Sequence, residues 1–556
     1  MKRLIINLSV FIVTMILMSS CTDGGKMARL LEHIPADADF VLVGGVSDIL
    51  ESAGGSTEQS KIKLPSYIAD IMDDSDSDKL DEFNSFLKKS GIDIEACGLF
   101  FSYRNDGPEH PIIVFSLTDR KKFIDAIEDE GYNDYDEENG VTFYKKKTYE
   151  SDSGSDYDDY SYFAVGDDFG YWMDDVWVGS SFKPMRVMAG AIDDFKDGTF
   201  ANTSLGSYIV KGNAMGLAVR IPDTPEIRRD LKFLNNFPIG AFCVYGEVDD
   251  NAITFTTKCF DRDGKDIKDD VFAKYMDTKA KINPEALSFL GKDECMVFAV
   301  SIKDFNWDKL VELVEQQGGL SRSERAMVSL ATSYLEKLDG TIAVGLGVTD
   351  GMSSFYKFAM DDITELSATF VVETKEGKGK TIINDLKGLM EQQEMSFTET
   401  TDGFEITEES VGTLYAKRFD DILVFSTHPI KKDAGNEIAK QAKLSDHMSA
   451  YAIVLNHKDK LMQDLAISND IKVTAFSDKS GTEGKFILEI SGGKGKDGVL
   501  AKLAQIINGL YENRESLAQG FNQRRGGYDY DYDDDYDDDD EVDSVCVDED
   551  EYVVEE

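Results

Sequence analysis

Cysteine is scarce in this chain, with six among 556 residues. Usage this sparse excludes a disulfide scaffold. No CxxC pair or Cys/His cluster is present, which argues against a structural zinc site. Cys243 and Cys259 lie on two predicted strands that flank the turn 249–251, so they could face each other. A buried pair of free thiols is the favoured interpretation, with a disulfide as the alternative.

Familiar catalytic signatures are missing too. The chain contains no GxSxG elbow, Walker loop or HExxH motif. His428 follows the predicted strand end at Phe425–Thr427, but no signature with Ser or Cys accompanies it. The same holds for His33, His110, His447 and His457. A surface or capping role is the default for each histidine, and no catalytic residue is predicted.

Two acidic segments resemble calcium-binding loops, and neither fits. Asp74–Asp78 starts like an EF-hand loop, but Lys79 stands where Gly is needed and Ser85 where Glu is needed. Asp261–Asp266 resembles a calcium turn, yet Lys265 occupies a ligand position. A plain acidic turn is the preferred interpretation there. The sequence therefore predicts no metal site and no cofactor.

Positive charge is in short supply. The 59 Lys and Arg residues face 106 Asp and Glu residues, which gives a net charge of −47. A field this negative disfavours nucleic acid and anionic lipid headgroups. The tail 513–556 is rich in Asp and Tyr, poor in aliphatic residues and predicted to be disordered. It could dock a cationic protein, or hold divalent ions diffusely without a cage.

What the chain does have is a signal at its N-terminus. Lys2 and Arg3 precede an apolar run at Leu4–Met18, then Ser19, Ser20 and Cys21. The run is shorter than the ~20 residues of a spanning helix, and a small-small-Cys ending is the pattern of a bacterial lipoprotein signal. We predict a signal peptide at 1–20, lipidation of Cys21 as a membrane anchor, and a short tether at 21–27. An ordinary secreted protein is the alternative.

The order of predicted elements repeats in two parts of the chain. Each part has a strand leading into a helix, a second strand and helix, an Asn-Gly or Asp-Gly turn, and a closing hairpin. These fall at 39–50, 112–130, 139–144 and 241–260, and again at 295–305, 368–392, 402–407 and 472–490. The sequence predicts an α+β fold of two similar repeats, 28–280 and 281–512, with antiparallel hairpins. Convergence of generic units is the alternative.

The closest match between the two parts is a pair of acids before an apolar strand. Asp174 and Asp175 are matched with Asp420 and Asp421. Their recurrence favours turn formation over glycosidase chemistry, because Asp bonds its own backbone in turns. The segment 132–160 of the first repeat has no counterpart of similar length, and it is predicted to be a mobile acidic insert.

Two amphipathic helices are expected in the second part. A capping box at Ser321–Glu324 starts one, and the other covers 498–511. Their apolar stripes are predicted to face the core, with a partner helix as the alternative. The stripes consist of Met327, Val328, Ala331, Tyr334, Leu335 and Leu338, and of Leu500, Leu503, Ala504, Ile507 and Leu510. Of the three tryptophans, Trp172 is the candidate for an exposed ligand platform.

The opening of the mature chain carries a resemblance. The segment Ile34–Val41, close behind the lipid Cys, is similar to the start of Bacteroidetes lipoproteins of a domain-of-unknown-function family. The resemblance implies an envelope lipoprotein and brings no catalytic residues with it.

These observations lead to two functional hypotheses. The first is a non-catalytic binding or assembly protein, anchored by its lipid in the outer membrane, on a face of that membrane that the sequence leaves open. The second is an envelope or surface hydrolase with a carboxylate-based site that acts on glycans or peptides.

Overall fold

The computed structural model describes most of the body of the chain. The described residues are 24–45, 50–57, 61–65, 74–101, 103–104, 107–108, 111–138, 140–149, 159–174, 184–194, 198–221, 237–268, 271–317, 322–348, 351, 366–408, 412–432, 436–478, 481–492 and 498–512. The predicted signal peptide, Cys21 and the tail 513–556 lie outside them. The predicted tether is already helical from Gly24 onwards.

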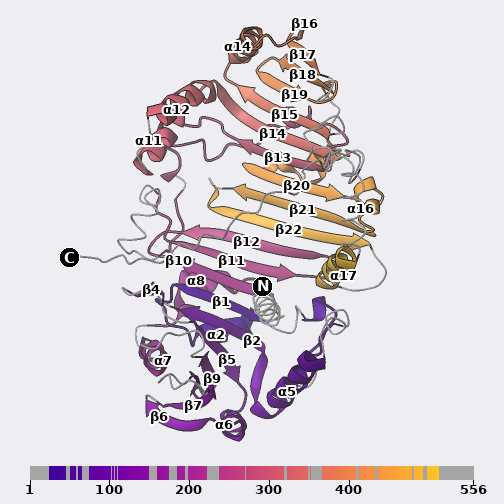
Figure 1. Cartoon of the computed structure of the whole chain (residues 1–556). Coiled ribbons are helices and arrows are strands. Elements are labelled where there is room, and N and C mark those ends of the chain that lie inside the picture. The colour runs from indigo at the N-terminus through magenta and orange to yellow at the C-terminus, as the bar shows by residue number, and fades with distance from the viewer. Residues whose placement is uncertain are drawn as a thin grey trace, which may run out of the picture. The chain divides into compact units, whose positions relative to one another are not determined.

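One antiparallel sheet of 20 strands organises the described residues (Figure 1). From one edge, its first strands are β6 (Asn133–Glu138), β7 (Val141–Tyr149), β8 (Asp159–Val165), β9 (Phe169–Asp174), β5 (Ile112–Leu117), β2 (Ile92–Phe101), β1 (Phe40–Gly45), β10 (Met215–Arg220), β11 (Ala241–Val248) and β12 (Ala252–Phe260). The sheet continues with β22 (Glu483–Gly492), β21 (Asn469–Asp478), β20 (Ser449–Leu455), β13 (Met296–Ser301), β14 (Leu338–Val348), β15 (Leu366–Thr374), β19 (Ile422–Ser426), β18 (Gly412–Phe419), β17 (Gly403–Glu408) and β16 (Thr398–Thr400). The predicted α+β class is confirmed.

Helices pack on both faces of this sheet. They are α2 (Gly24–Leu31), α5 (Asp74–Ser90), α6 (Arg120–Asp129), α7 (Pro184–Asp193), α8 (Ser204–Ile209), α10 (Pro284–Leu287), α11 (Trp307–Gln317), α12 (Arg322–Leu335), α14 (Lys378–Gln392), α15 (Glu437–Gln441), α16 (Lys460–Asp464) and α17 (Val499–Glu512). Helices α2, α7 and α8 bury one face of β1 and its neighbours, and α10 and α15 bury the same face of β13 and its neighbours. We call this the helix-covered face.

The helix-covered face carries the two largest cores. Val41 and Val43 of β1 are fully buried beneath α2, α7 and α8. Val297 and Ala299 of β13 are buried beneath α10 and α15. Side chains alternate along a strand, so the two residues named on each strand point to the same side. Residues that pair in neighbouring strands also share a side, and following these pairs from β1 to β13 places all four residues on one face of the sheet.

Several expectations from sequence need correction. Asp174 ends β9, where it pairs with Ser161, and does not start a strand. The acidic turn that matches Asp420 and Asp421 is Asp167-Asp168, between β8 and β9, because both pairs connect the two strands at the same place in the strand order. The sequence match was therefore shifted by seven residues, and Asp175 lies outside the described residues.

The predicted insert at 132–160 is largely structured. It contains β6 and all of β7, which form a hairpin around Gly140, whose φ is +79°. The side chains of β6 are exposed, which explains why the segment has the composition of a loop. Its backbone nevertheless pairs with β7 at one edge of the sheet. Residues 150–158 lie outside the described residues.

The two predicted stripes are only partly buried. Met327 of α12 is 65% exposed and Ile507 of α17 is 56% exposed. Leu338 begins β14 instead of ending the helix. In α17, Leu500, Leu503 and Leu510 do pack against the sheet.

Cys243 and Cys259 lie on opposite faces of the sheet. Cys243 is paired with Lys258, the neighbour of Cys259, so the two thiols point to different sides. Both are free, as are Cys97 and Cys295. Burial raises the pKa of Cys243 to about 12, which makes it an inert core residue.

The N-terminal helix α2 is predicted to be essential to the first core. Leu30 is fully buried against the sheet, so Leu30→Ala should lower the free energy of unfolding by about 2–5 kcal/mol. Arg29→Ala, at an exposed position on the same helix, should change it by less than about 0.5 kcal/mol. Urea unfolding measures both. Equal effects would show that α2 does not pack as described.

Candidate functional site

The central strands separate apolar from charged residues between the two faces. Phe255 of β12 pairs with Phe486 of β22, and their ring centroids are 6.3 Å apart. The other side of these strands is mixed: Lys258 lies 3.2 Å from Glu483 across the pair, and Ile487 is apolar. The two sides therefore differ mainly in charge, because the side of Phe255 carries no charged residue on either strand.

An apolar row crosses the sheet on the side of Phe255. Residues directly opposite one another in neighbouring strands share a face. Following these pairs from β12 to β19 gives Phe255, Phe486, Ala475, Tyr451, Phe298, Val344, Phe370 and Phe425. We call these eight residues the aromatic row. Every member is apolar or aromatic, and five are phenylalanines.

The residues beside the aromatic row are also uncharged. Along one side they are Thr257, Gly484, Ser477, Ser449, Val300 and Ile342. Along the other they are Ile253, Leu488, Val473, Ile453, Met296 and Leu346. The aromatic row with these two flanks forms what we call the open face.

The open face is incompletely covered in the described part of the chain. Phe298 is 44% exposed, Phe370 is 39% exposed and Phe486 is 37% exposed. Further along the same side, Phe242 of β11 is 39% exposed. Single exposed apolar residues are ordinary, but a contiguous group on one surface marks an interaction site.

Helices cover the margins of this side of the sheet. Helix α14 packs on Ile342, Val372 and Leu423 at one end. Helices α5 and α6 pack around Ile113 and Trp172 at the other, and α17 covers Ile253 and Leu488. Between these helices more than a third of the side-chain surface of Phe242, Phe298, Phe370 and Phe486 is exposed. The candidate site is therefore a broad apolar sheet face bounded by helices (Figure 1).

A second cluster lies beneath the helix-covered face. Glu294, just before β13, is completely buried. Its Oε2 accepts the Gly291 N–H at 2.7 Å, while its Oε1 has no hydrogen-bond partner. Burial raises the pKa of Glu294 to about 7, against the lowering effect of the Thr369 hydroxyl and the Gly291 N–H. This carboxyl is close to half protonated near neutral pH.

His428 reaches the same spot from β19. A Cβ added to Gly291 would lie 2.9 Å from His428 Nε2 and 3.0 Å from Glu294 Oε1, so both atoms flank this glycine. The other ring nitrogen, Nδ1, lies 3.1 Å from Ser426 Oγ and 3.4 Å from Ser367 Oγ. Burial lowers the pKa of His428. The sequence showed His428 but none of these partners.

The polar cluster is built for packing more than for reaction. Ser426 is buried and also accepts the His428 backbone N–H, while Thr369 lies 3.2 Å from its hydroxyl. The Asn436 side-chain amide donates to the backbone carbonyls of Gly291 and Glu294, and its Oδ1 accepts the Ala439 N–H and so caps α15. These bonds tie α10, α15 and the sheet together, and they leave the serine hydroxyl out of reach of a substrate.

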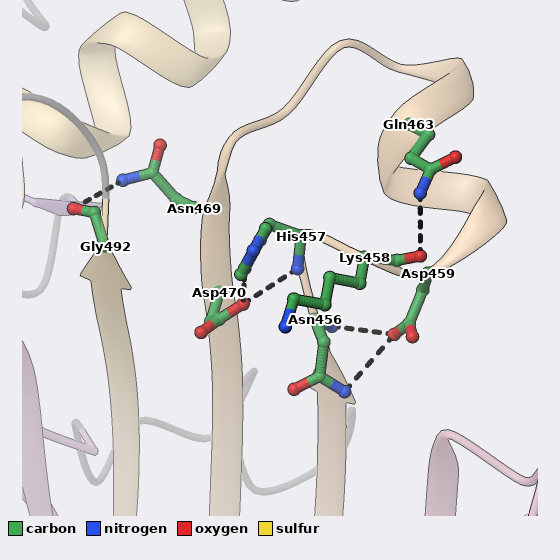
Figure 2. A network of polar contacts seen from close by, with 8 residues as sticks. All are labelled: Asn456, His457, Lys458, Asp459, Gln463, Asn469, Asp470 and Gly492. Carbon is green, nitrogen blue, oxygen red and sulfur yellow. Dashed lines mark hydrogen bonds and ion pairs between the residues drawn. The ribbon is translucent and has the colours of Figure 1, made fainter.

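A third polar network joins the ends of β20 and β21 (Figure 2). Asp470 Oδ1 accepts the backbone N–H of His457 at 2.8 Å, and the same oxygen lies 2.8 Å from His457 Nδ1. These bonds lower the pKa of Asp470. Asp459 accepts the Asn456 N–H at 2.7 Å, and Gln463 donates to the Lys458 carbonyl. The network fixes the connection before β21, and no metal-binding group of three or more His, Cys, Asp or Glu occurs among the described residues.

The residues singled out from sequence fall in different places. Trp172 is half-buried on β9, and its indole N–H donates to Ser161 Oγ at 2.8 Å, which favours a packing role over a ligand platform. Asp261 accepts the N–H groups of Asp263 and Lys265, so 261–266 is a closed acidic turn. Cys21 and the acidic tail lie outside the described residues.

One glycine pattern escaped the sequence analysis. Gly493, Gly495 and Gly498 are spaced as in a dinucleotide-binding loop, and they lie between a strand and a helix. That loop requires a parallel βαβ unit, whereas β22 is antiparallel to both its neighbours. The context is wrong for a nucleotide site, and 493–497 lie outside the described residues.

Comparisons with known proteins add little. No protein-family model and no curated protein sequence matches the chain. Among solved structures, crystal form III of TP0453 is similar at 16% identity, over 43% of this chain and 80% of that one, with a TM-score of 0.22. Crystal form IV gives 15% identity over 41% and 79%, with a TM-score of 0.22. Values this low support no inference about fold or function. In the part of the chain that is described, no helix is both long and apolar enough to cross a membrane.

The buried carboxyl predicts a pH-dependent stability. The pKa of Glu294 is about 7 when folded against an ordinary value of 4.5, so its contribution is fully present below pH 4.5 and is lost as pH rises through about 7. Between pH 5 and pH 8 we expect it to lower the free energy of unfolding by about 2–3 kcal/mol. Urea titrations at both pH values measure the change.

Glu294→Gln should remove this part of the pH dependence. Lys292→Gln, at an exposed position two residues away, should keep it. A Glu294→Gln protein whose pH dependence equals that of the wild type would contradict the assignment.

Proposed function

We propose that this protein is a non-catalytic binding protein of the bacterial cell envelope, which takes an apolar ligand or partner on the open face. The observation that carries the proposal is the uncharged aromatic row with its exposed phenylalanines. A chain with net charge −47 has ample charged side chains to place there, and it places none in the aromatic row or its two flanks. Burial of apolar area is the main favourable term in association.

The two halves of the sheet are proposed to be repeats, 28–280 and 281–512. Ten strands from β1 to β12 and ten from β13 to β22 follow the same order in the sheet. Phe255 and Phe486 pair with each other at the junction, as equivalent residues on a two-fold axis would. Duplication supports the proposal because it widens the apolar face beyond what one repeat offers.

The lipid anchor at Cys21 is proposed to hold this body at the outer membrane. The apolar run before Cys21 and the small residues at the cleavage site support it. Several acyl chains give the stable attachment that a single chain does not. The acidic tail is proposed to act as a solvated segment that can meet cationic proteins or divalent ions.

A hydrolase acting on glycans or peptides is less well supported. Glycosidases need two carboxyl groups about 5–10 Å apart at one bond. Glu294 is completely buried, and its neighbour Asp293 is exposed, so these two do not form such a pair.

The binding proposal predicts a site for an apolar dye. Nile red should gain fluorescence with the purified full chain, and Phe298→Ser should weaken its binding about tenfold, because one exposed aromatic contact is lost. Phe83→Ser is the matched control, since Phe83 is also 44% exposed but lies on α5. Equal dye binding by both variants would remove the open face as the site.

The proposed lipid anchor predicts that loss of Cys21 moves the protein out of the membrane fraction. Wild-type protein expressed in a Gram-negative host should sediment with membranes and incorporate labelled palmitate, whereas Cys21→Ser should do neither. Cys546→Ser is the control, because it removes a cysteine that has no place in the lipidation signal. Palmitate incorporation by Cys21→Ser would overturn the assignment.

A further inference from the structure

The aromatic row is continuous over many strands. From Phe370 to Phe255 it crosses seven strands, β15, β14, β13, β20, β21, β22 and β12, with no charged side chain. Strands are ~4.8 Å apart, so the row extends over about 29 Å. An acyl chain in one membrane leaflet occupies about 15 Å, half of the ~30 Å hydrocarbon core. The part of the row from Tyr451 on β20 to Phe370 on β15 covers three strand spacings, about 14 Å, which matches the length of one such chain.

Charge decides among the occupants. A second copy of this chain would bring another net charge of −47 against the first, which opposes self-association through this face. An acidic protein or an anionic lipid surface meets the same repulsion.

The polar groups nearest the row are neutral hydroxyls. Ser449 and Ser477 lie on the flank of the row next to Tyr451 and Ala475, and their Oγ atoms are 2.6 Å apart. Thr257 continues this flank on β12, opposite Gly484. Hydroxyls can bond to an uncharged glycerol or ester group, and they offer nothing to balance an anionic headgroup.

Resting on the proposed binding function, we propose that the open face binds the acyl chain of a single lipid with an uncharged headgroup. The chain runs along the aromatic row from β20 to β15, against Phe298 and Phe370, whose exposed surface it buries. The headgroup lies on the side of Ser449 and Ser477.

Displacement of Nile red by monoacylglycerols tests the proposal. The full-length protein carries Cys21→Ser, so that no acyl chain of its own is present, and each monoacylglycerol is used below its micelle-forming concentration. Lengthening the chain from eight to ten to twelve carbons should tighten binding about fourfold per CH₂ group, because each buried CH₂ adds a constant increment. The fatty acid of the same length should displace the dye more weakly, because its carboxylate is repelled.

Two substitutions in the aromatic row test whether the acyl chain of the lipid contacts it. Phe298→Ser and Phe370→Ser should each raise the concentration for half-displacement about tenfold, whereas Phe83→Ser should not change it. Thermal unfolding of each variant checks that it is folded. Native mass spectrometry should show one lipid per protein.

The outcomes separate this proposal from the one it rests on. Nile red binding that depends on Phe298 but is not displaced by any monoacylglycerol would overturn the lipid and leave a binding face for an apolar protein segment. Displacement without dependence on chain length would overturn it as well. A dimer that hides the dye site, seen by light scattering, would assign the face to a second copy. Dye binding that ignores Phe298 would overturn both proposals.

Discussion

The pairing of β12 with β22 is the constraint on which the rest of the body depends. It joins the two halves of the chain into one sheet through the partners from Ala252 with Glu489 to Lys258 with Glu483. A slip of one residue in this register would turn every side chain of one half to the other face. If the first half turned over, Lys258 would enter the apolar side and Phe255 would leave it. The ion pair between Lys258 and Glu483, which crosses this junction, favours the observed register.

Much of the fold could be predicted from sequence because alternation and turns are local signals. The strands β5, β11 and β12 lie inside the predicted units 112–130 and 241–260, and α6 follows β5 behind the Asp119 cap, as the first of these units predicts. β6 could not be found in this way, because all its side chains are exposed and acidic or polar. Its backbone pairing with β7 holds it in the sheet, and composition carries no trace of that pairing.

The polar cluster was out of reach for a different reason. Glu294, Thr369 and His428 come from three separate segments, and only the order of strands brings β13, β14, β15 and β19 together. Gly345 is part of the reason that Glu294 can be buried, since a Cβ there would lie 1.9 Å from Glu294 Oε2. A buried carboxyl is costly unless it is hydrogen-bonded or neutral. In Glu294 both conditions contribute: the Gly291 N–H donates a hydrogen bond to the carboxyl, and the raised pKa favours its neutral form.

Strong negative charge and an uncovered apolar face look incompatible, but each explains how the other can exist. An exposed apolar surface of this kind promotes aggregation in a weakly charged protein. With a net charge of −47, two copies repel each other before their open faces meet, so the face can stay available. In the proposed function, this charge opposes anionic partners at long range and leaves uncharged ligands unaffected. The exposed Phe298, Phe370 and Phe486 would then supply the short-range attraction.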